Sequence, residues 1–349
     1  MLEEGPYRIV GRGTKQGWGN PVSGASTFST EGFDKIVEHN VGDLTAVVEA
    51  GVPMATLREE LAAEGQMLAL DPPGDGTIGG VIATGDSGPL RHRYGGPRDL
   101  VLGVTVALSD GTVAKAGGKV IKNVAGYDLA KLMTGAFGTL GLITRVALRL
   151  HPIPREQVTV IGESDDPAVI AAAAMAASHA QLEAQSLDID WRGDQGMVLM
   201  RFGGVAAERQ ARAAEDVLLE AGTETSLVHD DQELWARQAE RQRGDVVVRV
   251  SGVQTQLAAL LGMASIQGAT VVGRAALGLS WVTLPDVSAV ASMRETLAPA
   301  SVVVLDRPAD VDIDPWGVED GPELTLMRRT KARFDARGVC NPGIYVGGI

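Results

Sequence analysis

The 349-residue sequence contains one cysteine, Cys340, and this scarcity excludes several classes of site. One cysteine can form neither an internal disulfide nor a cysteine-based zinc or iron–sulfur site. Basic residues are also in the minority, with 31 Lys and Arg against 44 Asp and Glu and a formal net charge of −13. Because phosphate contacts need clustered basic side chains, nucleic acid is not an expected partner.

Long apolar runs are lacking as well. The best run, residues 168–177, is far too short to span a bilayer, and the acidic start Met1–Glu4 precedes no apolar stretch of the kind that a signal peptide has. With the lone cysteine, these features predict a cytoplasmic protein, associated with a membrane at most through partners. The composition, 45% hydrophobic and 21% charged, is typical of a globular chain, and its length suffices for two domains.

Glycine, in contrast, is abundant, with 44 residues, and the first 150 positions are rich in it. Short β-like runs separated by turns predict strands there, and one helix is predicted between Pro53 and Gly65. The predicted strands are 43–52, 100–109 and 141–150, and the predicted helix is 54–64.

After Pro152 and Pro154 the pattern changes to an alternation of strands and helices. The predicted strands are 158–161, 197–202, 246–250 and 302–305, and the predicted helices begin near 166, 206, 254 and 287. This order favours an α+β layer of helices on one sheet. A basic helix is predicted over 322–337. We therefore expect three segments: a first domain at 1–152, a second at 153–317, and a C-terminal helix and tail at 318–349.

The first glycine-rich loop is GRGTKQGWGN, residues 11–20. Backbone amides in such a turn can surround phosphate oxygens, and Thr14 and Lys15 add a hydroxyl and a positive charge. The loop lacks the spacing of a Walker A motif, and Gln16 stands where the dinucleotide fingerprint needs glycine. It is suited to a diphosphate, although a plain turn between strands would explain it equally well.

A second run, DPPGDGTIGGVIATGDSGP at 71–89, has hardly a bulky side chain. Such a segment lets the backbone pass close to a large flat ligand and donate amide hydrogens to it. The two loops could hold one diphosphate from opposite sides. A third segment, KNVAGYDLAKLMTGAFGTLGLITRV at 122–146, predicts a short helix near 128–133 that leads into a strand.

Taken together, five blocks resemble the FAD-binding domain of the vanillyl-alcohol oxidase/PCMH flavoprotein family. They are GRGTK, TIGGVIATGDSG, RYGGPRDLVLGVTVALSDGTV, the segment 122–146 and the closing FDARGVCNPG. Within that family, the spacing is most similar to the FAD-binding subunits of bacterial glycolate oxidases. The resemblance implies an α+β fold with a PCMH-type two-subdomain FAD-binding domain and a ferredoxin-like cap domain.

The resemblance also implies a role for each matching position. The first loop would contact the pyrophosphate, the second the pyrophosphate and isoalloxazine, and the later segments the flavin. The implied cofactor-binding residues are Gly11, Arg12, Gly13, Thr14, Lys15, Thr77, Gly79, Gly80, Ala83, Thr84, Ser87, Gly88, Asn123, Gly126, Tyr127, Ile143 and Asn341. Many relatives attach FAD through His or Cys; Thr14 and Lys15 stand where a loop histidine would be, so we expect non-covalent FAD. Relatives also carry a strand and helix before the first loop, and this sequence begins almost at the loop.

Catalytic residues are less well indicated. Relatives that oxidise 2-hydroxy acids alone carry histidines and acids after the cap, whereas the five histidines here end at His229 and are scattered. That pattern argues against the usual base and metal cluster, and no metal site is expected. The weak candidates are His92, Arg93 and Tyr94, which could bind an anionic substrate or move a proton. A solvated basic turn explains His92 better, and packing explains Arg93 and Tyr94 equally well.

The sequence thus predicts an FAD-binding redox subunit of a glycolate (2-hydroxy-acid) oxidase complex, inactive alone. Its expected partners are a catalytic flavin subunit and an iron–sulfur subunit, and a small 2-hydroxy acid is the expected substrate of the complex. One alternative is a self-sufficient FAD-dependent 2-hydroxy-acid dehydrogenase. The other is a non-redox assembly subunit with a degenerate flavin site, against which the intact loop glycines argue.

Overall fold

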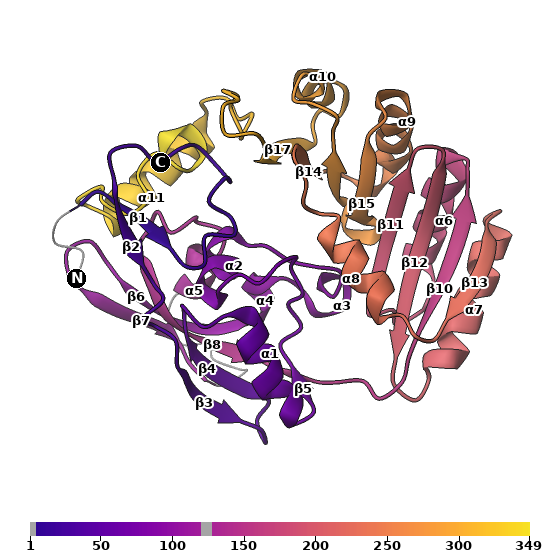
Figure 1. Ribbon diagram of the computed structural model, residues 1–349, viewed down its shortest axis with the longest axis horizontal. Coiled ribbons are helices and arrows are strands. Elements are labelled where there is room, and N and C mark those ends of the chain that lie inside the picture. The colour runs from indigo at the N-terminus through magenta and orange to yellow at the C-terminus, as the bar shows by residue number, and fades with distance from the viewer. Residues whose placement is uncertain (1–4, 120–127) are drawn as a thin grey trace. The chain divides into compact units, whose positions relative to one another are not determined.

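The computed structural model describes residues 5–119 and 128–349, which form two compact units (Figure 1). The first unit holds the described residues up to Ser87 together with those of Gly95–Ile153 and Val318–Ile349. The second holds Gly88–Tyr94 and Pro154–Gly317. These bounds lie within one residue of the expected divisions at 152/153 and 317/318, except that Gly88–Tyr94 groups with the second unit.

The main sheet of the first unit has five antiparallel strands. In sheet order they are β3 (Ile36–Asn40), β4 (Thr45–Glu49), β8 (Leu142–Arg149), β6 (Val101–Ala107) and β7 (Val113–Gly117). The three strands predicted in this part are confirmed as β4, β6 and β8. The central strands are mostly apolar and buried, whereas the edge strands β3 and β7 have partly buried and exposed side chains, so the central strands stand out in the sequence.

Helices and small sheets surround this sheet. The helices are α1 (Met54–Ala63), α2 (Ile78–Thr84), α4 (Pro97–Leu100), α5 (Leu129–Met133) and α11 (Pro322–Phe334), with a 3₁₀ turn at Val346–Gly348; a two-stranded sheet joins β5 (Gln66–Met67) to β9 (His151–Pro152). The predicted helices at 54–64, 128–133 and 322–337 are confirmed, the last ending at Phe334.

The prediction of an open loop over 71–89 needs correction, because α2 lies within it. Thr77 caps the helix by accepting the Gly80 amide, and Gly85 ends it in the left-handed conformation at φ 68°. Two adjacent glycines hid this helix, since glycine disfavours helix interiors. Gly79 is needed for close packing, because a Cβ there would lie 2.7 Å from the Cβ of Ala50.

The C-terminal tail extends a small parallel sheet at the start of the chain. Strand β1 (Tyr7–Val10) pairs with β2 (Ser26–Ser29), and Tyr7 bridges Cys340 on its other side. The Tyr7 amide donates to Val339 O at 2.7 Å, and the Asn341 amide donates to Tyr7 O at 2.9 Å. The tail is therefore a structural part of the first unit.

The second unit is built on one eight-stranded antiparallel sheet, ordered β13-β10-β12-β11-β15-β16-β14-β17. The strands are β10 (Gln157–Ser164), β11 (Ser186–Arg192), β12 (Gln195–Gly203), β13 (Glu224–Val228), β14 (Val247–Ser251), β15 (Thr270–Arg274), β16 (Leu279–Thr283) and β17 (Ser301–Asp306). The helices are α3 (Arg91–Tyr94), α6 (Pro167–His179), α7 (Ala207–Glu220), α8 (Gln232–Glu240), α9 (Leu257–Gln267) and α10 (Ala289–Thr296), with 3₁₀ turns at Gln254–Gln256 and Ala275–Leu277.

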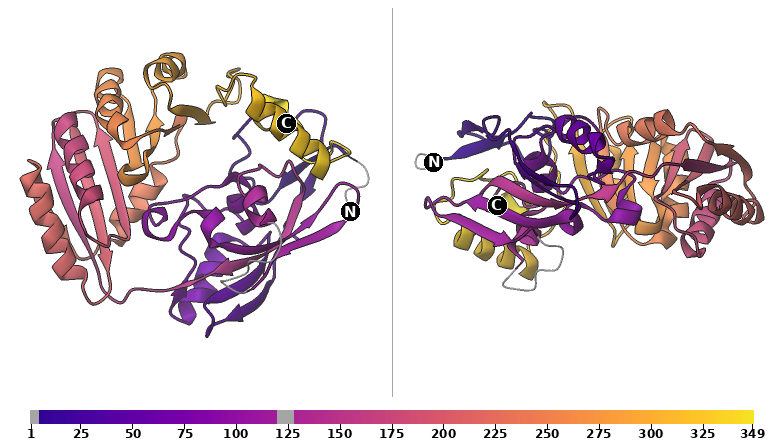
Figure 2. Two further views of the ribbon diagram at one scale, coloured as in Figure 1. Left: turned by 180° about the vertical axis from the view of Figure 1, so that it is seen from behind. Right: turned by 90° about the horizontal axis from the view of Figure 1, so that it is seen from below.

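This unit contains the same motif twice. Strand β10 to β13 and strand β14 to β17 each follow the order β-α-β-β-α-β, and each half has the ferredoxin-like strand order 4-1-3-2. The two halves join through antiparallel pairing of β11 with β15, so the cap consists of two ferredoxin-like halves (Figures 1 and 2).

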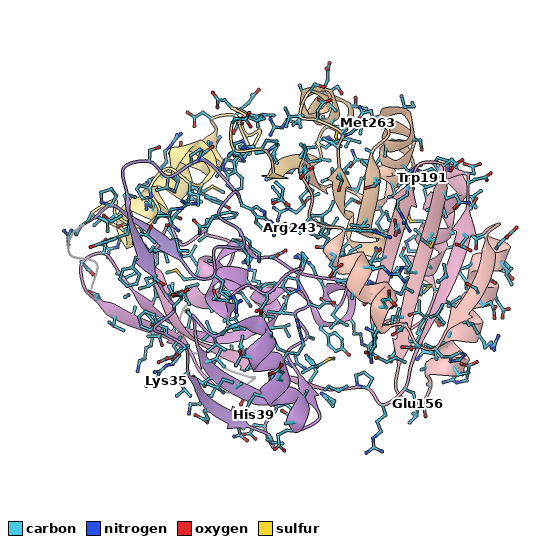
Figure 3. The ribbon with its side chains drawn as sticks, in the orientation of Figure 1. Lys35, His39, Glu156, Trp191, Arg243 and Met263 are labelled. Atoms are coloured by element: carbon cyan, nitrogen blue, oxygen red, sulfur yellow. The ribbon has the colours of Figure 1, made fainter. Side chains whose placement is uncertain are left out.

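The two faces of this sheet differ in chemistry. Helices α6, α7, α9 and α10 cover an apolar face, which includes Ile189 and Trp191 of β11 (Figure 3). Side chains alternate along a strand, so Asp188 and Asp190 point to the other face, where Gln238 of α8 donates to Asp188. Among the described residues, no helix is long and apolar enough to cross a membrane.

Candidate functional site

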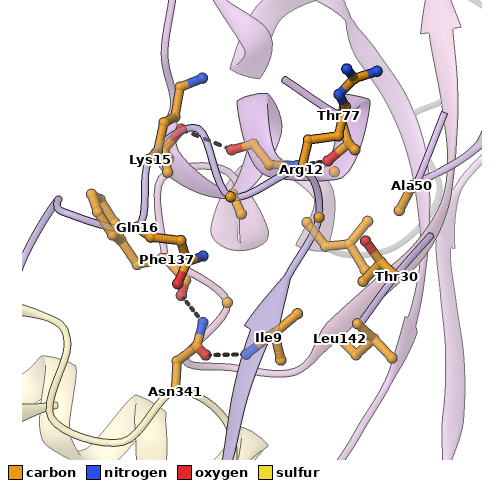
Figure 4. A pocket seen from close by; sticks show the side chains of 18 of the residues that line it. Ile9, Arg12, Lys15, Gln16, Thr30, Ala50, Thr77, Phe137, Leu142 and Asn341 are labelled. Atoms are coloured by element: carbon orange, nitrogen blue, oxygen red, sulfur yellow. Dashed lines mark hydrogen bonds between the residues drawn. The ribbon is translucent and has the colours of Figure 1, made fainter. Parts of the chain in front are cut away.

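A groove in the first unit collects segments that are distant in the sequence (Figure 4). It contains about 740 Å³ of empty space, part of it open to solvent. Its walls come from the loop after β1, from α2 with the ends of β2 and β4, from the turn that leads into β8, and from the C-terminal tail. Six stretches of chain, at residues 9–16, 30, 50, 77–84, 137–143 and 341–344, therefore meet at one elongated site.

Twelve of the residues implied by the resemblance line this groove. They are Gly11, Arg12, Gly13, Thr14, Lys15, Thr77, Gly79, Gly80, Ala83, Thr84, Ile143 and Asn341. Ser87 is buried and does not line it, and Gly88 groups with the second unit. Asn123, Gly126 and Tyr127 lie outside the described residues.

Nine other lining residues were not predicted from the sequence. They are Ile9, Gln16, Thr30, Ala50, Phe137, Gly138, Gly141, Leu142 and Ile344. Gly138 and Gly141 stand in a quoted block and could have been found there, because the turn before a strand is a common place for ligand contacts. Nothing in the sequence marks Thr30 or Ala50, which reach the groove only because β2 and β4 end there.

Glycines allow the walls of the groove to approach each other closely. A Cβ on Gly11 would collide with the side chain of Thr77, and one on Gly138 would lie 2.8 Å from Asn341 Nδ2. Gly13 adopts φ 71°, a conformation that favours glycine. These positions form a backbone-lined cradle, which suits a large ligand with a diphosphate.

The amides at the start of α2 have acceptors within the protein. Those of Ile78 and Gly79 donate to Val52 O and Ala50 O at 2.9 and 2.7 Å, and that of Gly80 donates to Thr77 Oγ1. The sequence predicted that backbone amides of this glycine-rich segment contact the diphosphate. Hydrogen bonding by these three amides would require breaking bonds that the structure shows. Positive side chains therefore become more important for an anionic ligand.

Two basic side chains line the groove among the described residues, Arg12 and Lys15. Arg12 pairs with Asp75 at 3.0 Å, and both side chains are 40% exposed or more. Lys15 is only 6% exposed and pairs with the buried Asp86 at 3.2 Å; its Nζ also lies 5.7 Å from the centre of the Trp18 ring. The groove thus has an exposed cation at one place and a buried one at another.

Asn341 fastens the tail to the groove. Its Oδ1 accepts the Ile9 amide at 2.6 Å, and its Nδ2 donates to Phe137 O at 2.7 Å, as Figure 4 shows. Asn341 has φ 43°, a region that asparagine tolerates better than most residues. One side chain therefore links β1, the 137–141 turn and the C-terminal tail.

A buried carboxylate supports this arrangement from behind. Asp335 accepts the amides of Val339 and Cys340 at 3.1 and 2.9 Å and pairs with Lys331 at 2.6 Å. Lys331 Nζ also donates to Thr139 O and Cys340 O. Burial acts to raise the pKa of Asp335, but hydrogen bonds from Lys331 and the Cys340 amide outweigh it, so this pKa lies below its ordinary value.

The free thiol of Cys340 is buried, and burial raises its pKa to about 12. It is a neutral, packed side chain at ordinary pH.

The weak catalytic candidates belong to the second unit. Arg93 pairs with Glu183 at 3.2 Å, and Tyr94 accepts a hydrogen bond from Gln185 at 3.2 Å. Arg274 Nε donates to Gly88 O at 3.2 Å, which ties the segment 88–94 to this unit. Burial, and then Arg93, lower the pKa of His92, so its imidazole is neutral at pH 7. Burial raises the pKa of Tyr94.

Comparison with known protein families matches residues 3–117 to the FAD binding domain family. Glycolate oxidase subunit GlcE from Escherichia coli (strain K12) is 37% identical over 163 residues, which are 46% of this chain and 46% of that protein. A mitochondrial D-lactate dehydrogenase [cytochrome] from Arabidopsis thaliana is 42% identical over 122 residues, 35% of this chain and 22% of that protein. These matches span half or less of the curated relatives.

Wider matches are weaker in identity. An FAD-linked oxidoreductase of Mycobacterium tuberculosis (strain ATCC 25618 / H37Rv) is 25% identical over 382 residues, 95% of this chain and 83% of that protein. A solved structure of alkyldihydroxyacetonephosphate synthase superposes with a TM-score of 0.70 at 15% identity, over 96% of this chain and 71% of that one. The latter match concerns the fold alone.

These comparisons confirm the family resemblance predicted from the sequence. The chain carries a PCMH-type FAD-binding domain in an α+β fold, is similar to glycolate oxidase subunit GlcE, and has FAD as its cofactor.

Proposed function

We propose that this FAD-binding chain is a redox subunit of a glycolate-type 2-hydroxy-acid oxidase complex, and that its FAD lies in the groove of the first unit. The observation that carries the assignment is the convergence of both glycine-rich segments, the 137–143 turn and the tail on one groove. Similarity to the glycolate oxidase subunit GlcE and to D-lactate dehydrogenases supports the substrate class.

Bound FAD would supply the hydride or electron acceptor, chemistry that no side chain provides. In the proposed site, the positive charges of Lys15 and Arg12 attract the negatively charged diphosphate, and Gly11 and Gly79 keep the walls free of side chains. Asn341 holds the tail against the 137–141 turn. No histidine or cysteine is among the described residues that line the groove, which supports non-covalent attachment.

Substrate oxidation needs further groups: a base for the hydroxyl proton and cations for the carboxylate. The five histidines lie on separate elements, and the described residues include no group of three or more His, Cys, Asp or Glu that could hold a metal. This distribution supports a division of labour in which a catalytic flavin subunit oxidises the 2-hydroxy acid and an iron–sulfur subunit takes part in electron relay.

The test is anaerobic reduction of the purified yellow chain. Glycolate or D-lactate alone should leave its visible spectrum unchanged, and addition of the two partner subunits with the same substrate should bleach it. Bleaching of the isolated chain by substrate would overturn the assignment. A spectrum that stays unbleached in the complete complex would also overturn it, provided that dithionite bleaches the same sample.

A second function is favoured by one observation, the neutral His92. Its Nδ1 is buried and makes no hydrogen bond to the described residues, and its lowered pKa suits a proton acceptor. A base of this kind is what a self-sufficient FAD-dependent 2-hydroxy-acid dehydrogenase would require. Loss of substrate-driven bleaching in His92→Ala, with FAD retained, would identify that function. A pure assembly role is opposed by the intact cradle of Gly11, Gly79 and Gly138.

A further inference from the structure

The buried ion pair between Lys15 and Asp86 connects the two glycine-rich segments. Lys15 comes from the loop after β1, and Asp86 follows the glycine that ends α2. Nζ lies 3.2 Å from Oδ2, and the two side chains are 6% and 2% exposed. Arg12–Asp75 and Arg145–Glu49 in the same unit are more exposed, whereas Lys331–Asp335, at 13% and 0%, is buried to a similar degree.

The carboxylate of Asp86 is fixed by its own surroundings. Oδ1 accepts the Ser87 amide at 2.9 Å, and the Asp86 amide donates to Val81 O at 3.2 Å. Lys15 has room beside it because position 76 is glycine: a Cβ there would lie 3.3 Å from Nζ. Lys15 lines the groove and Asp86 does not. A ligand in the groove can therefore contact Lys15 without contacting Asp86.

A buried ion pair is poorly explained by stability alone. Desolvation of two charges can exceed their attraction, and a well-packed apolar pair often stabilises a fold equally well. Placement of such a pair in the wall of a cofactor groove points instead to a function of the charge. The ligand proposed for the groove carries a diphosphate, for which the amides of Ile78, Gly79 and Gly80 have no spare hydrogen.

We propose that Asp86 is a positioning residue, which holds the Lys15 ammonium where it can bind the FAD diphosphate. The negative charge of Asp86 at the same time lowers the affinity for FAD. This inference depends on the proposed location of FAD. In the empty groove, Asp86 neutralises the buried ammonium and keeps the two segments together. When FAD is bound, Lys15 interacts with both the Asp86 carboxylate and the diphosphate, and the negative charge of Asp86 repels the diphosphate.

The proposal gives the two partners opposite effects on FAD affinity. Lys15→Met removes the cation and leaves the negative charge of Asp86 uncompensated near the diphosphate, so FAD binding should weaken about tenfold to hundredfold. Asp86→Asn keeps the shape and the acceptor for the Ser87 amide but removes the opposing charge. It should bind FAD about threefold to tenfold more tightly, while its empty form melts at a lower temperature.

The measurement is titration of the FAD-free full chain with FAD, followed by flavin fluorescence. ADP, which keeps the diphosphate, should show the same order of affinities by displacement of FAD, whereas riboflavin, which has no phosphate, should not distinguish the variants. Glu38→Gln provides the matched control, because it makes the same charge change in the exposed pair with Lys119. Its FAD affinity should change less than about twofold.

The double variant keeps the test decisive if empty Asp86→Asn does not fold. Lys15→Met/Asp86→Asn should bind FAD more tightly than Lys15→Met, since removal of Asp86's charge relieves repulsion. Weaker binding by both Asp86 variants than by their parents would mean a merely structural role and would overturn the inference. Failure of the wild-type chain to bind FAD would instead refute the proposed groove.

Discussion

The two units of this protein reach a defined structure in different ways. The second unit repeats one ferredoxin-like pattern and fills one apolar face with helices, so its strands and helices follow from local periodicity. The first unit brings together residues as distant as Ile9 and Asn341, 332 positions apart, around a groove of glycine backbone. The elements of the second unit are thus specified mainly by residues close in sequence, whereas the groove of the first unit depends on residues far apart in sequence.

The largest expected difference between the two units comes from a glycine-to-alanine substitution made in each of them. Gly79→Ala places a Cβ 2.7 Å from Ala50 Cβ and 2.9 Å from Ala50 O, so it should cost about 1–3 kcal/mol of stability and abolish FAD retention. Gly262→Ala, in α9, meets nothing within 4 Å among the described residues and should stabilise by about 0.5–1 kcal/mol. Thermal melts and flavin absorbance check both; equal effects in the two variants would contradict the contrast.

Removal of the tail's fastening should have the next largest effect. Asn341→Ala leaves the Ile9 amide and Phe137 O without their partner, which should cost about 1–3 kcal/mol, and FAD affinity should fall. Denaturant titration with and without FAD measures both. Asn40→Ala, at an exposed turn, is the control and should change stability by no more than about 0.5 kcal/mol. An unchanged FAD affinity in Asn341→Ala would show that the tail is dispensable for the groove.

Acid should loosen the same tail. The pKa of Asp335 is below its ordinary value of 3.8, so its contribution to stability is present above that value and is lost as pH falls through the lower, folded pKa. FAD release should therefore increase below about pH 4 in the wild type. Asp335→Asn should release FAD more readily at neutral pH and lack this part of the acid response. Identical pH profiles of the two proteins would exclude Asp335 as the origin.

The smallest effect concerns Cys340, which is packed beside the groove. With its pKa at about 12, the thiol should resist 5,5′-dithiobis(2-nitrobenzoic acid) at pH 8 in the native protein and react with one equivalent after unfolding. Rapid labelling of the folded chain would contradict the buried placement of the tail.

Elements whose sequence signals come from neighbouring residues were predicted well, and elements that depend on tertiary contacts were not. Strongly apolar strands such as β4 and β8, and helices capped by residues such as Asp166, were found close to their observed bounds. Helix α2 was missed because its adjacent glycines oppose helix formation in isolation, and packing against Ala50 compensates only in the folded unit.

For the groove, motif resemblance identified twelve lining residues that periodicity alone could not. It did not reveal Thr30, Ala50 or the Lys15–Asp86 pair, because these depend on where strand ends and loops meet in space. Conversely, it suggested an amide-lined diphosphate site at the start of α2, whereas those amides already have acceptors. We therefore expect the charges of Lys15 and Arg12 to contribute to diphosphate binding in the proposed site.

The most direct test of the proposed FAD site is the visible spectrum of the purified chain before and after acid precipitation, in the wild type and in Gly79→Ala. We expect a yellow wild-type protein that releases one equivalent of FAD into the supernatant, and a colourless variant that remains folded by circular dichroism. Flavin retained in the pellet would contradict non-covalent binding, and full colour in Gly79→Ala would contradict the location of FAD in this groove.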